Sequence, residues 1–230
     1  MSLTPELVAL CWREEKEYPR EWDGKWTRYT EDEHNALATR LIREAGGGPV
    51  WIFAYGSLLW KPGFDFAEKR RATALGWHRS FCMKMTNWRA TPSAPGLMMA
   101  LDRGGRCDGA IYRLDAADGA AQLFSMLRRE LWYHEHSEMV RWIPVSTEGE
   151  RLRALVFWAG PRGDNIALKL PLEEVARLHA RACGYAGSCA EYLYNTISHL
   201  EEMGIRDRNL WRLQELVAAE IKQAHGLAGE

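Results

Sequence analysis

The sequence predicts an α+β fold: a mostly antiparallel sheet that closes into a small β-barrel and is surrounded by helices, with a helical extension at the N-terminus. Three observations lead to this prediction. An apolar segment at Val50–Trp60 ends in a glycine turn, bulky segments further along the chain are separated by short polar turns, and most of the helical patterns lie near the two ends. Strands that follow one another in hairpins, with helices grouped outside them, are typical of α+β domains.

Two helices are expected before the first strand. The T-P-E motif at residues 4–6 combines a capping hydroxyl, a proline at the first helical position and an early acid, so a helix should start there, carry Leu10 on its apolar face and end at Pro19. Thr30 and Glu33 have the spacing of a capping box and predict the start of a second helix. The G-G-G-P segment that ends this helix precedes a strand and lacks a following Gly-Lys-Ser/Thr, so we do not interpret it as a phosphate loop.

The segment Val50–Trp60, V-W-I-F-A-Y-G-S-L-L-W, begins as a continuous run of branched and aromatic residues, which favours a buried strand. Tyr55, Gly56 and Ser57 follow at once. Glycine lets a ligand approach the main chain closely, and successive amide N–H groups in a turn can bind one anionic or polarised oxygen. The residues alone leave two interpretations open: a small-anion or carbonyl-binding turn, or an ordinary tight turn that closes a core strand.

The remaining elements follow from alternation, helical spacing and turn residues. Expected strands are residues 71–86, 97–101, 109–114, 138–146 and 151–159, with one hairpin through residues 103–106 and another through 147–150. Expected helices are residues 119–130, 171–183, 188–204 and 209–225.

Composition narrows the possible partners. The 30 basic residues nearly balance 31 acidic ones, for a net charge of −1, so there is no basic field to attract nucleic acid or anionic lipid, and we expect a small-molecule partner. No apolar segment approaches the length of a membrane span and no signal peptide is evident, so we expect a cytoplasmic protein without a membrane partner. Five irregularly spaced cysteines indicate neither a disulfide framework nor a zinc finger.

Five ordered blocks of sequence resemble one known family. They are V-W-I-F-A-Y-G-S-L-L-W-K-P with G-W-H-R-S-F-C, the P-G of residues 95–96 with M-M-A-L, G-G-R-C-D-G-A-I-Y-R-L, R-R-E-L, and A-E-Y-L. Together they resemble the ChaC-type γ-glutamylcyclotransferases, which release 5-oxoproline from glutathione. The resemblance implies a γ-glutamylcyclotransferase-like domain at residues 49–230, a helical extension at residues 1–48, and no cofactor.

The resemblance also implies a reaction: the α-amino group of a γ-glutamyl unit attacks its own γ-carbonyl and expels an amine. One carboxylate can take the proton from the ammonium and return it to the leaving amine, so neither a metal nor a covalent intermediate is needed. The R-R-E-L block implies Glu130 for this role. For binding the substrate and stabilising the oxyanion, the resemblance implies the residues of the strand and turn and one tyrosine of the A-E-Y-L block: Ile52, Phe53, Ala54, Tyr55, Gly56, Ser57, Leu58 and Tyr192.

The residues themselves leave two roles open for Glu130 and two for Tyr192. Glu130 adjoins the apolar face formed by Leu123, Leu127 and Leu131, where partial burial would raise its pKa, but a surface glutamate paired with a neighbouring arginine fits the same pattern. Tyr192 is either a pocket residue or a core tyrosine on a helix.

The sequence departs from the family pattern at two places. Ala54 stands where the family often has glycine, and L-W-Y-H-E-H follows Glu130 where relatives usually carry a loop with glycine and tyrosine. The second departure bears on which γ-glutamyl compound the protein accepts.

Other candidate sites have simpler explanations. His134 and His136 would share a face of a strand, but no third metal ligand is evident nearby, so no metal site is predicted. Cys82 lies in an expected strand and is predicted to pack as a small apolar residue.

Three functions therefore remain to be distinguished. The first is a cyclotransferase that cleaves glutathione to 5-oxoproline and Cys-Gly. The second is a cyclotransferase that acts on another γ-glutamyl amide. The third is a non-catalytic binding or regulatory protein on the same fold. The sequence supports no prediction of oligomeric state.

Overall fold

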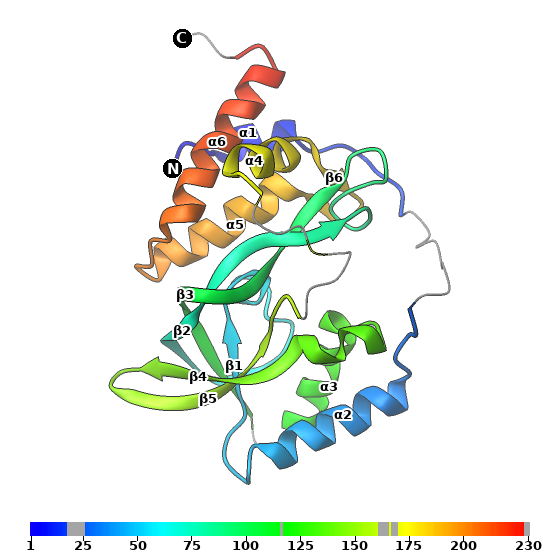
Figure 1. Cartoon of the computed structure of the whole chain (residues 1–230), viewed down its shortest axis with the longest axis vertical. Helices are drawn as coiled ribbons and strands as arrows, with labels where there is room; N and C mark the ends of the chain where they lie inside the picture. The colour runs from blue at the N-terminus through cyan, green and yellow to red at the C-terminus, as the bar shows by residue number, and fades with distance from the viewer. Residues whose placement is uncertain (18–25, 116, 161–165, 167–169, 228–230) are drawn as a thin grey trace. The chain divides into compact units, whose positions relative to one another are not determined.

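The computed structural model describes residues 1–17, 26–115, 117–160, 166 and 170–227. The chain forms two compact units, each assembled from segments that are distant in sequence (Figure 1). Unit 1 comprises Met1–Arg20, Ser80–Ala100 and Arg162–Glu230, and unit 2 comprises Glu21–Arg79 and Leu101–Pro161.

The elements follow the predicted order along the chain. The helices are α1 (Pro5–Leu10), α2 (Glu31–Glu44), α3 (Gly119–Glu130), α4 (Leu172–Arg181), α5 (Cys189–Glu202) and α6 (Arg208–Ala224), with 3-10 helices η1 (Ser57–Leu59) and η2 (His134–Met139). The strands are β1 (Trp51–Ala54), β2 (Phe66–Met85), β3 (Gly96–Leu114), β4 (Val140–Thr147), β5 (Glu150–Phe157), β6 (Cys183–Gly184) and β7 (Gly187–Ser188).

A closed barrel is the central structure of unit 2. Its strands are hydrogen-bonded in the order β1-β3-β2-β4-β5. Strand β1 is antiparallel to β3, with Ala54 opposite Ala110, and its parallel pairing with β5 at Ile52 and Leu155 closes the barrel. The predicted hairpin of β4 and β5 is confirmed, with Thr147 opposite Glu150. The mostly antiparallel barrel is therefore confirmed, with one parallel pair that the sequence did not predict.

The barrel core of unit 2 explains why β1 has no polar side chain. All four residues of β1 are buried, and the core around them is formed by small, branched and aromatic side chains from every strand of the barrel. Two helices of the same unit, α2 and α3, pack against each other. The Thr30–Glu33 capping box is present and starts α2 as predicted.

Unit 1 is a helical cluster. Helix α4 packs against α5 and α6, and α1 packs against α5 and α6 (Figure 1). Each of the predicted C-terminal helices is confirmed to within a few residues. The buried side chain of Gln214 on α6 holds the start of the chain, because its Oε1 accepts from the amides of Ser2 and Leu3 at 2.8 and 2.7 Å.

Two predicted boundaries are wrong. Residues 97–101 and 109–114 are not the arms of a hairpin but parts of the single strand β3. Gly104 and Gly105 have φ angles of 104° and 75°, as a turn would require, but they lie beside β2, where Gly76 has a φ angle of 80°. His78 bonds to the Gly104 carbonyl at 3.0 Å, so glycines bend both long strands at one level of the barrel.

The first helix is also shorter than predicted, since α1 ends at Leu10 and not at Pro19. Leu10 was expected on the apolar face but is 41% exposed. Pro19 lies outside the described residues. Tertiary contacts replace the helix. The Arg13 guanidinium donates to the Arg181 carbonyl at 2.6 Å, at the end of α4, where helical carbonyls lack partners and attract cations.

The predicted boundary between residues 48 and 49 remains a prediction. Of the helices that the structure describes in residues 1–48, α1 belongs to unit 1 and α2 to unit 2. Within the described part of the chain, none of the helices combines the length and the apolar character that crossing a bilayer requires.

Gly109 provides a test of the packing behind β1. A Cβ atom at this position would lie 2.3 Å from the Ala54 carbonyl oxygen and 3.2 Å from the Phe53 ring. Main-chain atoms cannot move aside as easily as the end of a side chain. The clash with the Ala54 carbonyl should therefore make Gly109→Ala lower the free energy of unfolding by about 2–3 kcal/mol. Chemical denaturation measures this change. Gly119→Ala is the control, since its Cβ would meet nothing closer than 4.0 Å. Equal stability of the two variants would contradict the close approach.

Candidate functional site

The Y-G-S turn is held in place from the barrel. The Tyr55 carbonyl accepts from Arg79 Nε at 2.6 Å, and the same guanidinium donates to the Asp108 carbonyl. The Tyr55 hydroxyl donates to the Phe157 carbonyl at 2.6 Å, which ties the turn to the end of β5. Arg79 is only 5% exposed, so the turn rests on a buried, multiply bonded cation.

The turn continues into a single helical turn. Leu59 and Lys61 donate main-chain hydrogen bonds to Gly56 and Ser57 at 2.9 and 2.8 Å, so the chain coils directly after the glycine. Such a conformation lets neighbouring amides share one direction, as the predicted oxyanion-binding turn requires. The turn conformation alone does not distinguish a ligand-binding turn from a structural one.

The predicted binding residues fall into two groups. The side chains of Ile52, Phe53 and Ala54 are fully buried in unit 2, and Leu58 is 6% exposed. These four residues therefore support the turn from within the protein. Tyr55, Gly56 and Ser57 form the turn itself, and the Ser57 hydroxyl has a direct contact with the residue that precedes Glu130, as described next.

Glu130 is the last residue of α3. The three leucines that flank it in the helical pattern, Leu123, Leu127 and Leu131, are fully buried, as the periodicity predicted. The Glu130 side chain is 25% exposed, and its Oε1 lies 3.0 Å from Arg129 Nε. Burial raises the pKa of Glu130 above the ordinary value of 4.5, and the Arg129 charge partly offsets this increase. Both interpretations of Glu130 are therefore partly right: it is a partly buried acid, and it is paired with a neighbouring arginine.

Arg129 links Glu130 to the turn. Its Nη1 donates to the carbonyls of Lys61 and Pro62 at 2.6 and 3.1 Å, and its Nη2 lies 3.3 Å from Ser57 Oγ. Gly63 leaves room for this guanidinium, since a Cβ there would lie 2.8 Å from Nη1. One side chain thus contacts the Y-G-S turn, the segment after it and the candidate acid.

Sequence reasoning missed the roles of Arg129 and Arg79. From the sequence, Arg129 is only a possible surface partner of Glu130, and Arg79 lies in a matching block with no role assigned to it. Their signal in the sequence is weak, because most arginines are solvated and only the tertiary structure shows that these two bind main-chain carbonyls.

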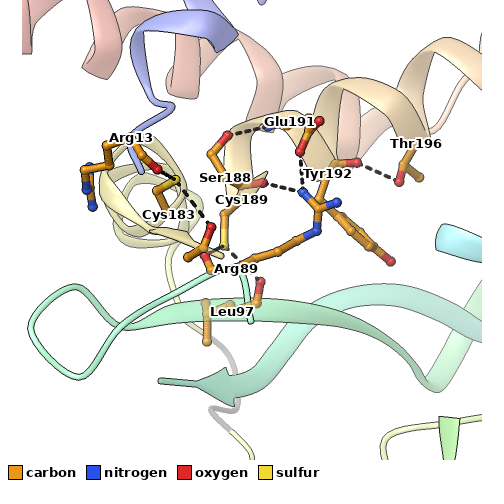
Figure 2. A network of polar contacts seen from close by, with 10 residues as sticks. Arg13, Arg89, Leu97, Cys183, Ser188, Cys189, Glu191, Tyr192 and Thr196 are labelled. Atoms are coloured by element: carbon orange, nitrogen blue, oxygen red, sulfur yellow. Dashed lines mark hydrogen bonds and ion pairs between the residues drawn. The ribbon is translucent and has the colours of Figure 1, made fainter. Parts of the chain in front are cut away.

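Tyr192 belongs to unit 1, where it is 4% exposed on α5. Figure 2 shows the Arg89 side chain reaching the first turn of α5, between Glu191 and Tyr192. Arg89 Nη1 lies 2.6 Å from Glu191 Oε2, its guanidinium carbon lies 5.8 Å from the centre of the Tyr192 ring, and the Phe81 ring packs edge-on at 6.1 Å. The Ser188 hydroxyl caps α5 by accepting from the Glu191 amide at 3.0 Å, and the Glu191 carboxylate binds Arg89.

The histidines after Glu130 have structural partners. His134 Nε2 lies 3.1 Å from Glu33 Oε2, and its ring stacks on Tyr29. His134 and His136 lie on the 3-10 helix η2 and not on a strand. Among the residues that the structure describes, no cluster of three or more His, Cys, Asp or Glu side chains could hold a metal ion. Cys82 is 1% exposed within β2, which confirms its packing role.

The site in unit 2 combines an acid of raised pKa with a turn that carries a hydroxyl and closely spaced amides. A carboxyl group of raised pKa can take and return a proton, and such a turn can stabilise an oxygen that gains negative charge. The fold and the site therefore define a helix-bearing β-barrel protein with a candidate acid/base centre.

Comparison with known proteins agrees with this class. Residues 50–220 match the family model described as ChaC-like protein, and the chain belongs to this family. A glutathione-specific γ-glutamylcyclotransferase of Escherichia coli is 35% identical over 176 residues, 76% of this chain and 75% of the relative. γ-Glutamylcyclotransferase 2-1 of Arabidopsis thaliana is 32% identical over 189 residues, 75% of this chain and 87% of the relative.

Solved structures agree on the fold. The crystal structure of a γ-glutamyl cyclotransferase specific to glutathione from yeast has a TM-score of 0.68 at 18% identity, covering 76% of this chain and 97% of the yeast chain. The predicted γ-glutamylcyclotransferase-like barrel is thereby confirmed.

The opposing effects of burial and Arg129 on Glu130 give a testable prediction. Removing the Arg129 charge in Arg129→Met should raise the pKa of Glu130 further, because the charge favours the ionised carboxylate. Carboxyl-carbon NMR titration measures this shift. Arg128→Met is a matched control, since Arg128 pairs with the exposed Glu31 at 3.3 Å. A Glu130 midpoint that is the same in both variants would show that Arg129 does not act on the carboxyl group.

Proposed function

We propose that this protein is a γ-glutamylcyclotransferase that cleaves glutathione to 5-oxoproline and Cys-Gly, with Glu130 as the acid/base. The observation that carries the proposal is the partly buried Glu130, of raised pKa, joined by Arg129 to the Y-G-S turn. Family membership and the names of the relatives from Escherichia coli and yeast support glutathione as the substrate.

The reaction begins with a proton transfer. The ionised Glu130 carboxylate takes a proton from the α-ammonium of the γ-glutamyl unit, and the nitrogen lone pair then attacks the γ-carbonyl carbon of the same unit. The new C–N bond closes a five-membered ring, and the carbonyl π electrons move to oxygen. Because nucleophile and electrophile belong to one molecule, little entropy is lost on reaching this geometry.

The tetrahedral oxyanion needs donors that are already in place. We assign this role to main-chain amides between Tyr55 and Leu58, with the Ser57 hydroxyl beside them. Removing one such donor in other enzymes costs about 10²–10³-fold in rate. Ile52, Phe53 and Ala54 support the turn from the barrel, and Arg79 fixes its carbonyl side.

Collapse of the intermediate completes the reaction. The oxyanion electrons restore the carbonyl, the bond to the cysteine nitrogen breaks, and protonated Glu130 donates its proton to that nitrogen. The ring nitrogen, which carried two hydrogens after the attack, then gives its second proton through the Glu130 carboxylate to the released amine, which leaves as an ammonium. The products are 5-oxoproline and Cys-Gly, and Glu130 returns to its ionised form. Tyr192, on α5, remains a proposed substrate-binding residue. The reaction needs no cofactor, nucleic acid or membrane.

We further propose that the protein acts in the cytoplasm. Its five cysteines are buried thiols, which is typical of proteins in a reducing compartment.

Replacing the proposed acid/base tests the assignment. Glu130→Gln should lower turnover of glutathione by about 10³-fold or more, because the amide can neither take nor return the proton, while substrate affinity stays near that of the wild type. Turnover is measured as 5-oxoproline by mass spectrometry, and affinity by calorimetry. The control is Glu31→Gln, which changes an exposed carboxylate on α2. Turnover retained by Glu130→Gln would refute the role of Glu130.

Stability gives a second measurement on the same variant. A raised carboxyl pKa means that the folded protein holds the proton more tightly than the unfolded chain, so ionisation of Glu130 lowers the free energy of unfolding as pH rises above 4.5. Glu130→Gln should therefore be at least as stable as the wild type at pH 7. A marked loss of stability would indicate a structural role instead.

The pH dependence of kcat/KM provides a further prediction. Because the ionised carboxylate starts the reaction, the rate should fall as pH decreases through the raised pKa of Glu130, at a pH above 4.5. In Arg129→Met this acidic limb should move to higher pH, whereas in Arg128→Met it should not. An acidic limb at or below pH 4.5 would contradict the proposed base.

A panel of substrates distinguishes the remaining functions. Glutathione, γ-glutamylcysteine and a simple γ-glutamyl amino acid are each incubated with the protein. Product from glutathione alone supports the proposal. Product only from another compound keeps the mechanism and changes the substrate, and no product from any of them favours a non-catalytic binding protein.

A further inference from the structure

Residues 26–34, the N-terminal arm, precede the part of the chain that matches the family model and lie along the segment that directly follows Glu130. Both belong to unit 2. The segment Leu131–Glu135 leaves α3 abruptly, because Leu131 has extended angles of φ −122° and ψ 97°. Main-chain hydrogen bonds, ring stacking and one buried histidine join these two segments.

Main-chain hydrogen bonds join the two segments side by side. The Tyr29 amide donates to the Trp132 carbonyl at 3.1 Å, and the His134 amide donates to the Thr27 carbonyl at 2.9 Å. Arg28 and Tyr133 form the antiparallel bridge between them. The arm therefore fixes the direction in which the chain leaves the candidate acid.

Side chains reinforce this pairing. The Tyr29 ring stacks with two histidine rings, with centroid distances of 4.0 Å to His134 and 4.9 Å to His34. At the far end, both Glu135 carboxylate oxygens accept from the Thr27 amide at 3.0 Å.

His34 holds the first carbonyl after Glu130. Its Nε2 lies 2.7 Å from the Leu131 carbonyl oxygen, and both residues are buried, His34 at 6% and Leu131 at 0% exposure. A carbonyl oxygen only accepts, so Nε2 carries the proton and donates. His34 itself is fixed in the first turn of α2, where its amide donates to Thr30 at 3.0 Å.

We propose that His34 is a positioning residue for Glu130: with the rest of the N-terminal arm, it holds the chain directly after the candidate acid and so sets where the carboxylate lies. This inference rests on the proposed function for its kinetic consequence. A displacement of about 1 Å at a reacting group can cost about 10²-fold in rate, so loss of the arm's contacts acts on turnover and not on folding alone.

The experiment compares His34→Phe with His34→Gln in the full chain. Phenylalanine keeps a ring of similar size but has no N–H to donate, whereas glutamine keeps a side-chain N–H. With glutathione, His34→Phe should lower kcat by about tenfold with KM within about twofold of the wild type, and His34→Gln should recover most of the loss.

A matched control separates positioning from stability. Leu41 lies two turns further along α2 and is 3% exposed, so Leu41→Ala should destabilise the same helix without touching the Leu131 carbonyl. Melting temperatures are measured for all variants, and kcat is compared well below them. An unchanged kcat in His34→Phe, or an equal fall of kcat in Leu41→Ala, would overturn the positioning role.

Two further measurements keep the test decisive. If His34→Phe does not fold, Glu135→Ala removes an exposed carboxylate from the other end of the contact and should lower kcat by about threefold at unchanged stability.

If the wild type forms no 5-oxoproline, the proposed function fails, and positioning is tested by carboxyl NMR instead. The Glu130 titration midpoint should then fall toward 4.5 in His34→Phe, as the loosened carboxyl gains water, and stay unchanged in Leu41→Ala. An unchanged midpoint in His34→Phe would overturn the inference.

Discussion

The candidate site depends on the position of one guanidinium group. Arg129 extends from the last turn of α3, donates to two carbonyls after the Y-G-S turn, reaches the Ser57 hydroxyl and pairs with the neighbouring Glu130. A planar group with several fixed donors can satisfy these partners at once, which a lysine cannot do. The turn and the acid come from segments about seventy residues apart, and this side chain links them directly in unit 2.

The same group limits how far the pKa of Glu130 is raised. Burial beside the leucines of α3 alone would raise the carboxyl pKa, and the adjacent positive charge opposes this increase. An acid that must both take and return a proton works best when its pKa is above that of a solvated carboxyl but not far above the working pH. Partial burial raises the pKa of Glu130, and the neighbouring cation acts against that increase. Arg129 is therefore a determinant of proton affinity as well as of geometry.

Elements with local signals were predictable from the sequence. The Thr30–Glu33 capping box, the β4–β5 hairpin and the leucine periodicity of α3 each depend on residues within a few positions of one another, and each is confirmed. The predicted hairpin at residues 103–106 was wrong because two glycines with positive φ occur equally in a turn and in a bent strand. Only the neighbouring bend in β2 distinguishes these two cases, and that neighbour lies about thirty residues away.

The site shows the same difference between local and tertiary information. Glu130 and the Y-G-S turn were recognisable from blocks of sequence, but Arg79, Arg129 and His34 act by binding main-chain carbonyls of distant residues. Every residue has a main-chain carbonyl, so the residue type does not show which carbonyl such a side chain binds. The first helices illustrate the consequence. Residues 1–48 are predicted only as a helical extension, yet they include His34, whose Nε2 holds the peptide carbonyl next to the candidate acid.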